Sequence, residues 1–152
     1  MQLAVIEFAR NVCGITKANS TEFDVDSKEP IIDLMADQKS VVNMGGTLRL
    51  GNYECTIKKD TLAYDDYKKT KILERHRHRY EFNNIYRQDY IDKGLRLSGL
   101  SPNKSLVEIV ECPANKYHIG SQFHPEFKSR PTKPHPLFVG LISNALDKKE
   151  GK

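Results

Sequence analysis

The chain has 152 residues, which suits a single domain with a core of moderate size. Its composition is polar, with 38% hydrophobic and 29% charged residues, and the net charge of +4 arises from 24 basic and 20 acidic side chains. That near balance does not by itself indicate a nucleic-acid-binding protein. Because no segment approaches the roughly 18 uninterrupted apolar residues of a membrane span, we expect none.

The chain opens on a predicted helix. Apolar residues recur at helical spacing from Met1 to Val12, and Gly14 follows at the position where a helix commonly ends. A buried amphipathic helix that begins at residue 1 without an N-cap residue looks like a piece of something longer.

The remaining chain alternates between short strands and helices. Strands are predicted at residues 30–35, 95–100, 105–112 and 117–123, and a strand pair that turns at Gly51-Asn52 is predicted at residues 47–57. Helices are predicted at residues 84–93, just before Gly94, and at residues 136–146. Residues 61–70 are polar and receive no assignment, and the lysine-rich tail, 147–152, is expected to be disordered. Strands outnumber helices, which indicates part of an α/β domain.

Three cysteines are present, at positions 13, 55 and 112. They form no paired motif and leave an odd one over, so neither a disulfide framework nor a zinc site is indicated. Reduced thiols are typical of cytosolic proteins, and we expect a cytoplasmic localisation.

The most informative motif is residues 121–127 (SQFHPEF), a short apolar strand that ends in His-Pro-Glu. Pro125 biases His124 toward an extended backbone, in which residues two apart point to the same side. The carboxylate of Glu126 can therefore reach the imidazole of His124 and set its tautomer. A general base held by an orienting acid has this arrangement, which is half of a catalytic triad. A strand-end turn with two solvated polar side chains would give the same spacing.

Residues 75–79 (RHRHR) form the densest run of charge. In an extended backbone the three arginines share one face and the two histidines share the other. The arginines could contact phosphates or grip a substrate carboxylate, and a solvated strand edge is the simplest alternative. A zinc site formed by His76, His78 and His118 is not expected, because the sequence announces no shaped cavity for it.

Residues 45–51 (GGTLRLG) are rich in glycine but do not form a phosphate loop. They lack the strand–GxxxxGK[ST]–helix context of that motif. Glycines that permit a tight turn into a hairpin explain this run better.

Three blocks together resemble the glutaminase domain of the CTP synthase family, which belongs to the class I, or triad, glutamine amidotransferases. The blocks are residues 45–51 (GGTLRLG), 74–83 (ERHRHRYEFN) and 124–138 (HPEFKSRPTKPHPLF). The resemblance covers nearly the whole chain except the lysine-rich tail. It implies that residues 1–146 are the C-terminal part of a flavodoxin-like α/β amidotransferase domain lacking its N-terminal strands, and that the isolated chain folds poorly.

The resemblance also assigns catalytic residues. His124 and Glu126 match two members of the family's triad. The family's nucleophile elbow reads Gly-x-Cys-x-Gly-Met-Gln, whereas this chain begins with Met1-Gln2, so the nucleophilic cysteine would lie just upstream of Met1. We therefore expect the chain alone to lack glutaminase activity.

Three further residues match the family's glutamine-binding positions. Arg79 matches the residue that binds the α-carboxylate of glutamine, and Glu22 matches the acid that receives its ammonium group. Gln2 matches a glutamine beside the substrate, and no residue is assigned to a metal.

The family hydrolyses glutamine and uses the ammonia for the ATP-dependent amination of UTP to CTP, a ligase reaction of pyrimidine biosynthesis. The resemblance implies ATP, UTP, Mg²⁺ and the activator GTP for a full, homotetrameric enzyme, and a synthase domain and the upstream half of the glutaminase domain as partners of this chain. We expect this fragment to bind no cofactor, nucleic acid or membrane. In the full enzyme, Arg49 is a candidate for the response to GTP. The alternatives are a non-catalytic glutamine-binding or regulatory module and a nucleic-acid binder that uses residues 75–79.

Overall fold

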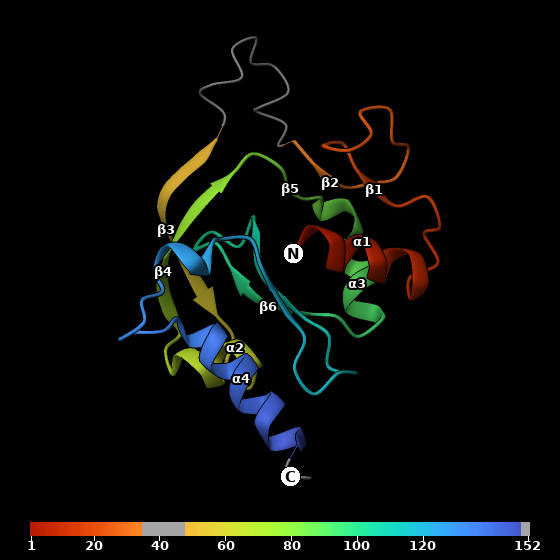
Figure 1. Ribbon diagram of the computed structural model, residues 1–152. Coiled ribbons are helices and arrows are strands. Elements are labelled where there is room, and N and C mark those ends of the chain that lie inside the picture. The colour runs from red at the N-terminus through yellow and green to blue at the C-terminus, as the bar shows by residue number, and fades with distance from the viewer. Residues whose placement is uncertain (35–47, 150–152) are drawn as a thin grey trace.

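The computed structural model describes residues 1–34 and 48–149, and these form an α/β fold with two sheets (Figure 1). The first three residues of the predicted glycine turn, 45–47, lie outside the described residues. The larger sheet has the strand order β4-β3-β6-β7-β8 and is antiparallel throughout. The smaller sheet has the order β1-β2-β5, with β1 and β2 parallel. The predicted α/β class is confirmed.

The strands are β1 (Asn19–Ser20), β2 (Pro30–Asp33), β3 (Arg49–Ile57), β4 (Lys71–His78), β5 (Glu81–Phe82), β6 (Arg96–Leu100), β7 (Val107–Glu111) and β8 (Ile119–Ser121). The α-helices are α1 (Gln2–Asn11), α2 (Leu62–Tyr67), α3 (Arg87–Asp92) and α4 (Pro136–Lys149), and short 3₁₀ helices cover Asn84–Tyr86 and Pro125–Phe127. None of the helices in residues 1–34 and 48–149 is long and apolar enough to cross a bilayer.

A long hairpin of β3 and β4 is the main difference from the predicted strands. The prediction of a turn at Gly51-Asn52 is wrong, because β3 continues unbroken through both residues. Gly51 has a φ of +113° but stays in register opposite His76 of β4. A turn at Gly51 would leave the backbone groups of the facing β4 strand without partners, which a folded chain avoids.

Helix α2 forms in the polar stretch that received no assignment. Thr61 caps its first turn by accepting a hydrogen bond from the backbone N–H of Tyr64, and Lys68 ends it in the left-handed region. The carboxylate of Glu111 also accepts hydrogen bonds from the N–H groups of Leu62 and Ala63. This last contact comes from a residue 48 positions away, so local sequence could not reveal it.

The terminal helices follow their predicted positions with one correction. α1 ends at Asn11 and Gly14 lies beyond it with a φ of +78°, as the sequence indicates. α4 continues to Lys149, three residues past its predicted end at 146. A lysine near the C-terminus of a helix, such as Lys149 here, interacts favourably with the helix dipole, which is consistent with the extension.

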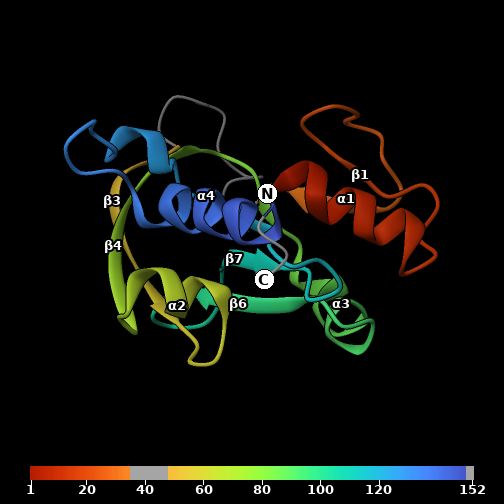
Figure 2. The same cartoon turned by 60° about the horizontal axis from the view of Figure 1, so that its bottom comes forward.

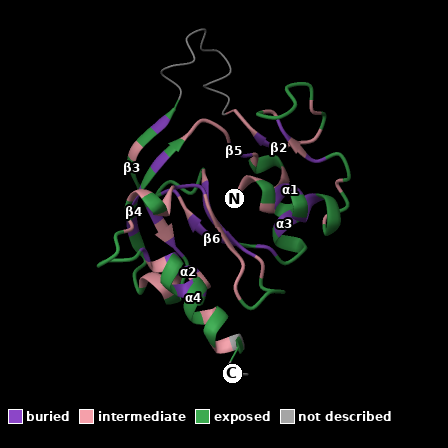
Figure 3. Cartoon of the chain, in the orientation of Figure 1, coloured by how far each residue is buried: buried purple, intermediate pink, exposed green. Residues whose placement is uncertain are grey.

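Two apolar clusters cover the larger sheet. One joins α1, the smaller sheet and α3 to β6 and β7, and the hydroxyl of Tyr90 ties α3 to α1 by donating to the carbonyl of Val5 at 2.6 Å. The other joins β3 and β4 to α2 and α4, which lie side by side away from α1 and α3 (Figures 1 and 2). Buried residues follow the strands, whereas much of α4 is exposed (Figure 3).

Gly99 in β6 allows a close approach between strands, which generates a test of the packing. A Cβ there would lie 2.6 Å from Cγ1 of Ile109 and 2.8 Å from Sγ of Cys55. Gly99→Ala should therefore lower the free energy of unfolding in urea by about 1–3 kcal/mol through overpacking. In an Ile109→Ala background the same change should cost clearly less. An equal loss of unfolding free energy in both backgrounds would show that the contact with Ile109 is not what excludes a side chain at position 99.

Candidate active site

Four residues far apart in sequence meet at one pocket of 390 Å³. Gln2 comes from the start of α1, Glu22 from the loop after β1, Arg79 from the end of β4 and His124 from the segment after β8. The pocket is completed by Leu48, Arg77, His78 and Tyr80. The amide Nε2 of Gln2 donates to Oε2 of Glu22 at 2.9 Å, so the two side chains orient each other. The structure thus brings together four of the five predicted site residues.

The fifth residue, Glu126, contacts His124 from outside the pocket. Its Oε1 lies 2.7 Å from Nδ1 of His124, as the spacing predicts. The backbone that brings them together differs from the predicted extended strand. His124 is extended, but Glu126 belongs to the 3₁₀ helix that begins at Pro125. Although partial burial opposes it, the hydrogen bond from His124 lowers the pKa of Glu126. The carboxylate therefore holds the Nδ1 proton, which leaves Nε2 to exchange protons with a substrate.

The backbone and an aromatic ring fix the position of the His124 imidazole. The N–H of His124 donates to the carbonyl of Arg75 at 2.9 Å, which ties this segment to β4. The Phe127 ring stacks on the imidazole at 4.9 Å between centroids.

β4 separates its charged residues onto two faces, as the sequence predicts. Arg75 and Arg77 are exposed, whereas His76 is fully buried. The Nδ1 of His76 lies 2.7 Å from Nε2 of His78, whose Nδ1 is 3.2 Å from the carbonyl of Tyr80. Burial, helped by the nearby Arg49, lowers the pKa of His76 to about 3 and that of His78 to about 4. Both imidazoles are therefore neutral near pH 7.

A buried charge cluster, defined as Arg49, Glu81 and Glu108, lies behind the histidines. The guanidinium of Arg49 is 3.0 Å from Oε1 of Glu81 and 2.9 Å from Oε1 of Glu108. Burial raises the pKa of Glu81 to about 7 against the attraction of Arg49, and it also raises the pKa of Glu108. Arg49 is only 8% exposed and its charge is engaged by the two carboxylates, and its part in the response to GTP stays a prediction.

A second polar cluster holds the segment that follows the His-Pro-Glu motif. The imidazole of His135, which is 3% exposed, has its Nε2 3.3 Å from Oε1 of Glu74 and 3.1 Å from the hydroxyl of Tyr67. Burial opposes ionisation of Glu74, yet the hydrogen bond from His135 lowers its pKa. The His-Pro-Leu-Phe block of the sequence thus has a structural use that spacing alone did not reveal.

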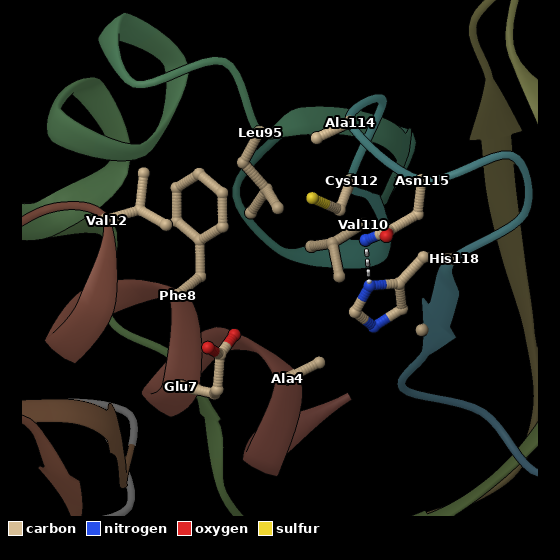
Figure 4. Close-up of a pocket in the computed structure, with 11 residues that line it drawn as sticks. Ala4, Glu7, Phe8, Val12, Leu95, Val110, Cys112, Ala114, Asn115 and His118 are labelled. Atoms are coloured by element: carbon tan, nitrogen blue, oxygen red, sulfur yellow. Dashed lines mark hydrogen bonds between the residues drawn. The ribbon is translucent and has the colours of Figure 1, made fainter.

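No cysteine lines the pocket with His124. Cys55 is fully buried, and burial raises the pKa of its thiol to about 12. Cys112 lines a separate cavity of 240 Å³ between α1 and the loop after β7, together with Glu7 and His118 (Figure 4). That cavity contains none of the predicted site residues. Within residues 1–34 and 48–149, no group of three metal-binding side chains is present.

Comparisons with known proteins agree with this geometry. The family described as glutamine amidotransferase class-I matches residues 1–144. The chain is 56% identical over 151 residues to a CTP synthase of Hydrogenobaculum sp. (strain Y04AAS1), covering 99% of this chain and 28% of that protein. It is 58% identical over 146 residues to the CTP synthase of Trichlorobacter lovleyi, covering 96% of this chain and 27% of the relative.

A solved structure extends the comparison to the fold. The glutaminase domain of Trypanosoma brucei CTPS with bound acivicin superposes with a TM-score of 0.89 at 37% identity, covering 97% of this chain and 57% of that chain. The resemblance to CTP synthase glutaminase domains and the class I fold are therefore confirmed. The chain spans about 28% of the length of the first of these relatives.

The buried histidines generate a prediction about acid stability. His76 is neutral in the fold, but in the unfolded chain it takes up a proton below its ordinary value of 6.5. The contribution of the neutral His76 to the free energy of unfolding is therefore present above pH 6.5. It is lost as the pH falls, because the unfolded chain then binds a proton that the folded chain does not. Between about pH 7.5 and about pH 5.5, His76→Gln should lose about 1 kcal/mol less unfolding free energy than the parent chain, measured in urea. Parallel pH dependences of the two chains would contradict this assignment.

Proposed function

The chain belongs to the class I glutamine amidotransferase family, and on that premise we propose that it forms the substrate-binding and acid–base half of a glutaminase site. The observation that carries the proposal is the single pocket shared by Gln2, Glu22, Arg79 and His124. Glu126 supports it from behind, 2.7 Å from the imidazole.

One end of free glutamine carries an α-carboxylate and an ammonium group, and the pocket offers a side chain of opposite charge to each. We assign its α-carboxylate to Arg79, because a guanidinium donates two parallel hydrogen bonds to a carboxylate. Its ammonium group is assigned to Glu22, whose carboxylate is oriented by Gln2. With that end held, the side-chain amide extends toward His124, and the pocket volume of 390 Å³ is within the range of small-molecule sites.

His124 supplies the proton transfers of amide hydrolysis. A thiolate attacks the amide carbon, and the imidazolium of His124 gives its proton to the departing ammonia as the C–N bond breaks. His124 then takes a proton from the water that attacks the thioester, and glutamate leaves with the thiolate restored. Glu126 keeps the imidazole in one tautomer and stabilises its charged form. Because none of the three cysteines lines the pocket, we propose that the thiolate is provided upstream of Met1 in a longer protein.

The proposed role of the ammonia follows from the relatives. They are CTP synthases, of which this chain spans a minor part. We propose that the ammonia aminates UTP to CTP at the expense of ATP, in a cytoplasmic homotetramer activated by GTP. The nucleotides and Mg²⁺ are assigned to the synthase part of that longer protein.

A non-catalytic glutamine-binding or regulatory module is the second candidate. One observation favours it, namely that the acid–base pair faces a pocket without a cysteine. The two candidates share the ligand and differ in whether the bound amide is hydrolysed.

The proposal predicts that the chain binds glutamine without hydrolysing it. Arg79→Ala should weaken binding in titration calorimetry at least about tenfold, because it removes a charged contact to the carboxylate. Arg75→Ala is the matched control, since Arg75 lies on β4, the strand just before Arg79, is exposed and does not line the pocket. Ammonia should not appear above background. Equal effects of the two substitutions would remove Arg79 from the site, and ammonia release that stops in His124→Ala would overturn the expected inactivity.

A second prediction concerns a longer protein that contains this chain and an upstream cysteine elbow. His124→Ala there should lower glutamine-dependent CTP formation by at least about a hundredfold, because the general acid is lost. CTP formation from added ammonium chloride should stay near the parent rate. Equal loss with both nitrogen sources would mean that His124 supports folding rather than ammonia release.

A further inference from the structure

Gln122 connects the segment that carries His124 with the turn that carries Arg79, and both of these residues line the pocket. It lies two residues before His124, and its backbone N–H donates to the carbonyl of Glu108 at 2.8 Å. Its side-chain Nε2 reaches back to the end of β4, where it lies 2.7 Å from the carbonyl oxygen of Tyr80. Tyr80 directly follows Arg79, so this hydrogen bond is made beside the proposed carboxylate-binding residue.

The neighbours of Gln122 settle the orientation of its amide. Nε2 faces the carbonyl of Tyr80 and, at 3.3 Å each, Oε2 of Glu81 and Nδ1 of His78. A flipped amide would place its oxygen 2.7 Å from the carbonyl oxygen of Tyr80, which can only accept, and this is unfavourable. Gln122 therefore acts as a donor. Its side chain is nearly buried, with the residue 6% exposed, so water cannot readily replace that donor.

The turn that carries Arg79 and Tyr80 is consequently fixed at two adjacent points. Gln122 holds the Tyr80 carbonyl, and Arg49 holds the carboxylate of Glu81 at 3.0 Å. The contact from Gln122 comes from the segment of His124, whereas the contact from Arg49 comes from β3. The Gln122 contact therefore adds to the backbone hydrogen bond from His124 to Arg75 a second link between the His124 segment and the chain that carries Arg79.

We propose that Gln122 is a positioning residue that holds Arg79 opposite His124 and thereby sets the affinity of the pocket for glutamine. This inference rests on the proposed function for its ligand, but the positioning itself does not require a ligand. A residue needed only for packing would be replaceable by an apolar side chain of similar length, whereas a donor would not.

Gln122→Met tests this distinction in the full chain, because it keeps the length of the side chain and removes both donors. We expect the dissociation constant for L-glutamine, measured by calorimetry, to rise about tenfold. Gln88→Met is the matched control, since Gln88 is exposed on α3 and its amide donates to Asp92 on the same helix, outside the pocket. Gln122→Asn should behave like Gln122→Met, because its side chain is one methylene too short to bring the amide donor to Tyr80. This second variant replaces Gln122→Met in the test if Gln122→Met does not fold.

NMR provides the readout of position without glutamine. The Nε–Hε signal of Arg79, assigned by its loss in Arg79→Ala, should shift or broaden in Gln122→Met, while the imidazole signals of His124 stay in place. Unchanged affinity and an unchanged Arg79 signal in a folded variant would overturn the inference, as would equal disturbance of Arg79 and His124. If the parent chain binds no glutamine, the proposed function fails, and the Arg79 signal alone still decides whether Gln122 positions that residue.

Discussion

The contact between Arg49 and two buried carboxylates is the constraint on which the site depends. Arg49 lies in β3, Glu108 in β7 of the same sheet, and Glu81 in β5 of the smaller sheet, so one guanidinium links both sheets. Burying such charges costs solvation, and removing one partner of a buried pair typically costs about 3–5 kcal/mol. We therefore infer that this cluster serves to fix the relative position of the strands it joins rather than to add stability. It fixes the smaller sheet, whose strand β1 precedes Glu22, against the larger sheet, whose strand β8 precedes His124.

Electrostatics distinguish the buried His76 and His78 from His124 at the pocket. His76 and His78 are kept neutral by burial and by Arg49, so they can pack beside the charge cluster without adding positive charge. His124 lies at the pocket, with a side chain that is 36% exposed and an acid at Nδ1. A pocket that handles protons needs one accessible imidazole, and the neutral pair behind it adds no positive charge to the site near pH 7.

Local sequence predicted the features that depend on near neighbours. The first helix, the strand before the His-Pro-Glu motif and the contact between His124 and Glu126 all follow from spacings of a few residues. Local patterns could not place Glu81 against Arg49 across 32 positions, and Gly51 was mistaken for a turn because its role depends on the facing strand. Gln2 and Glu22 came only from the family resemblance, and the resemblance singled out Arg79 from the arginines of residues 75–79, since nothing in their local spacing marks a shared pocket.

The central claim is that one end of glutamine is held between Arg79 and Glu22 while its amide meets His124. A crystal structure of this chain with L-glutamine tests it most directly. The account predicts density in the pocket of Gln2, Glu22, Arg79 and His124, with the α-carboxylate on the guanidinium of Arg79, the ammonium on Glu22 and the carboxamide nearest His124. Glutamine bound in the reverse direction, or a pocket that stays empty while glutamine occupies another surface, would contradict it.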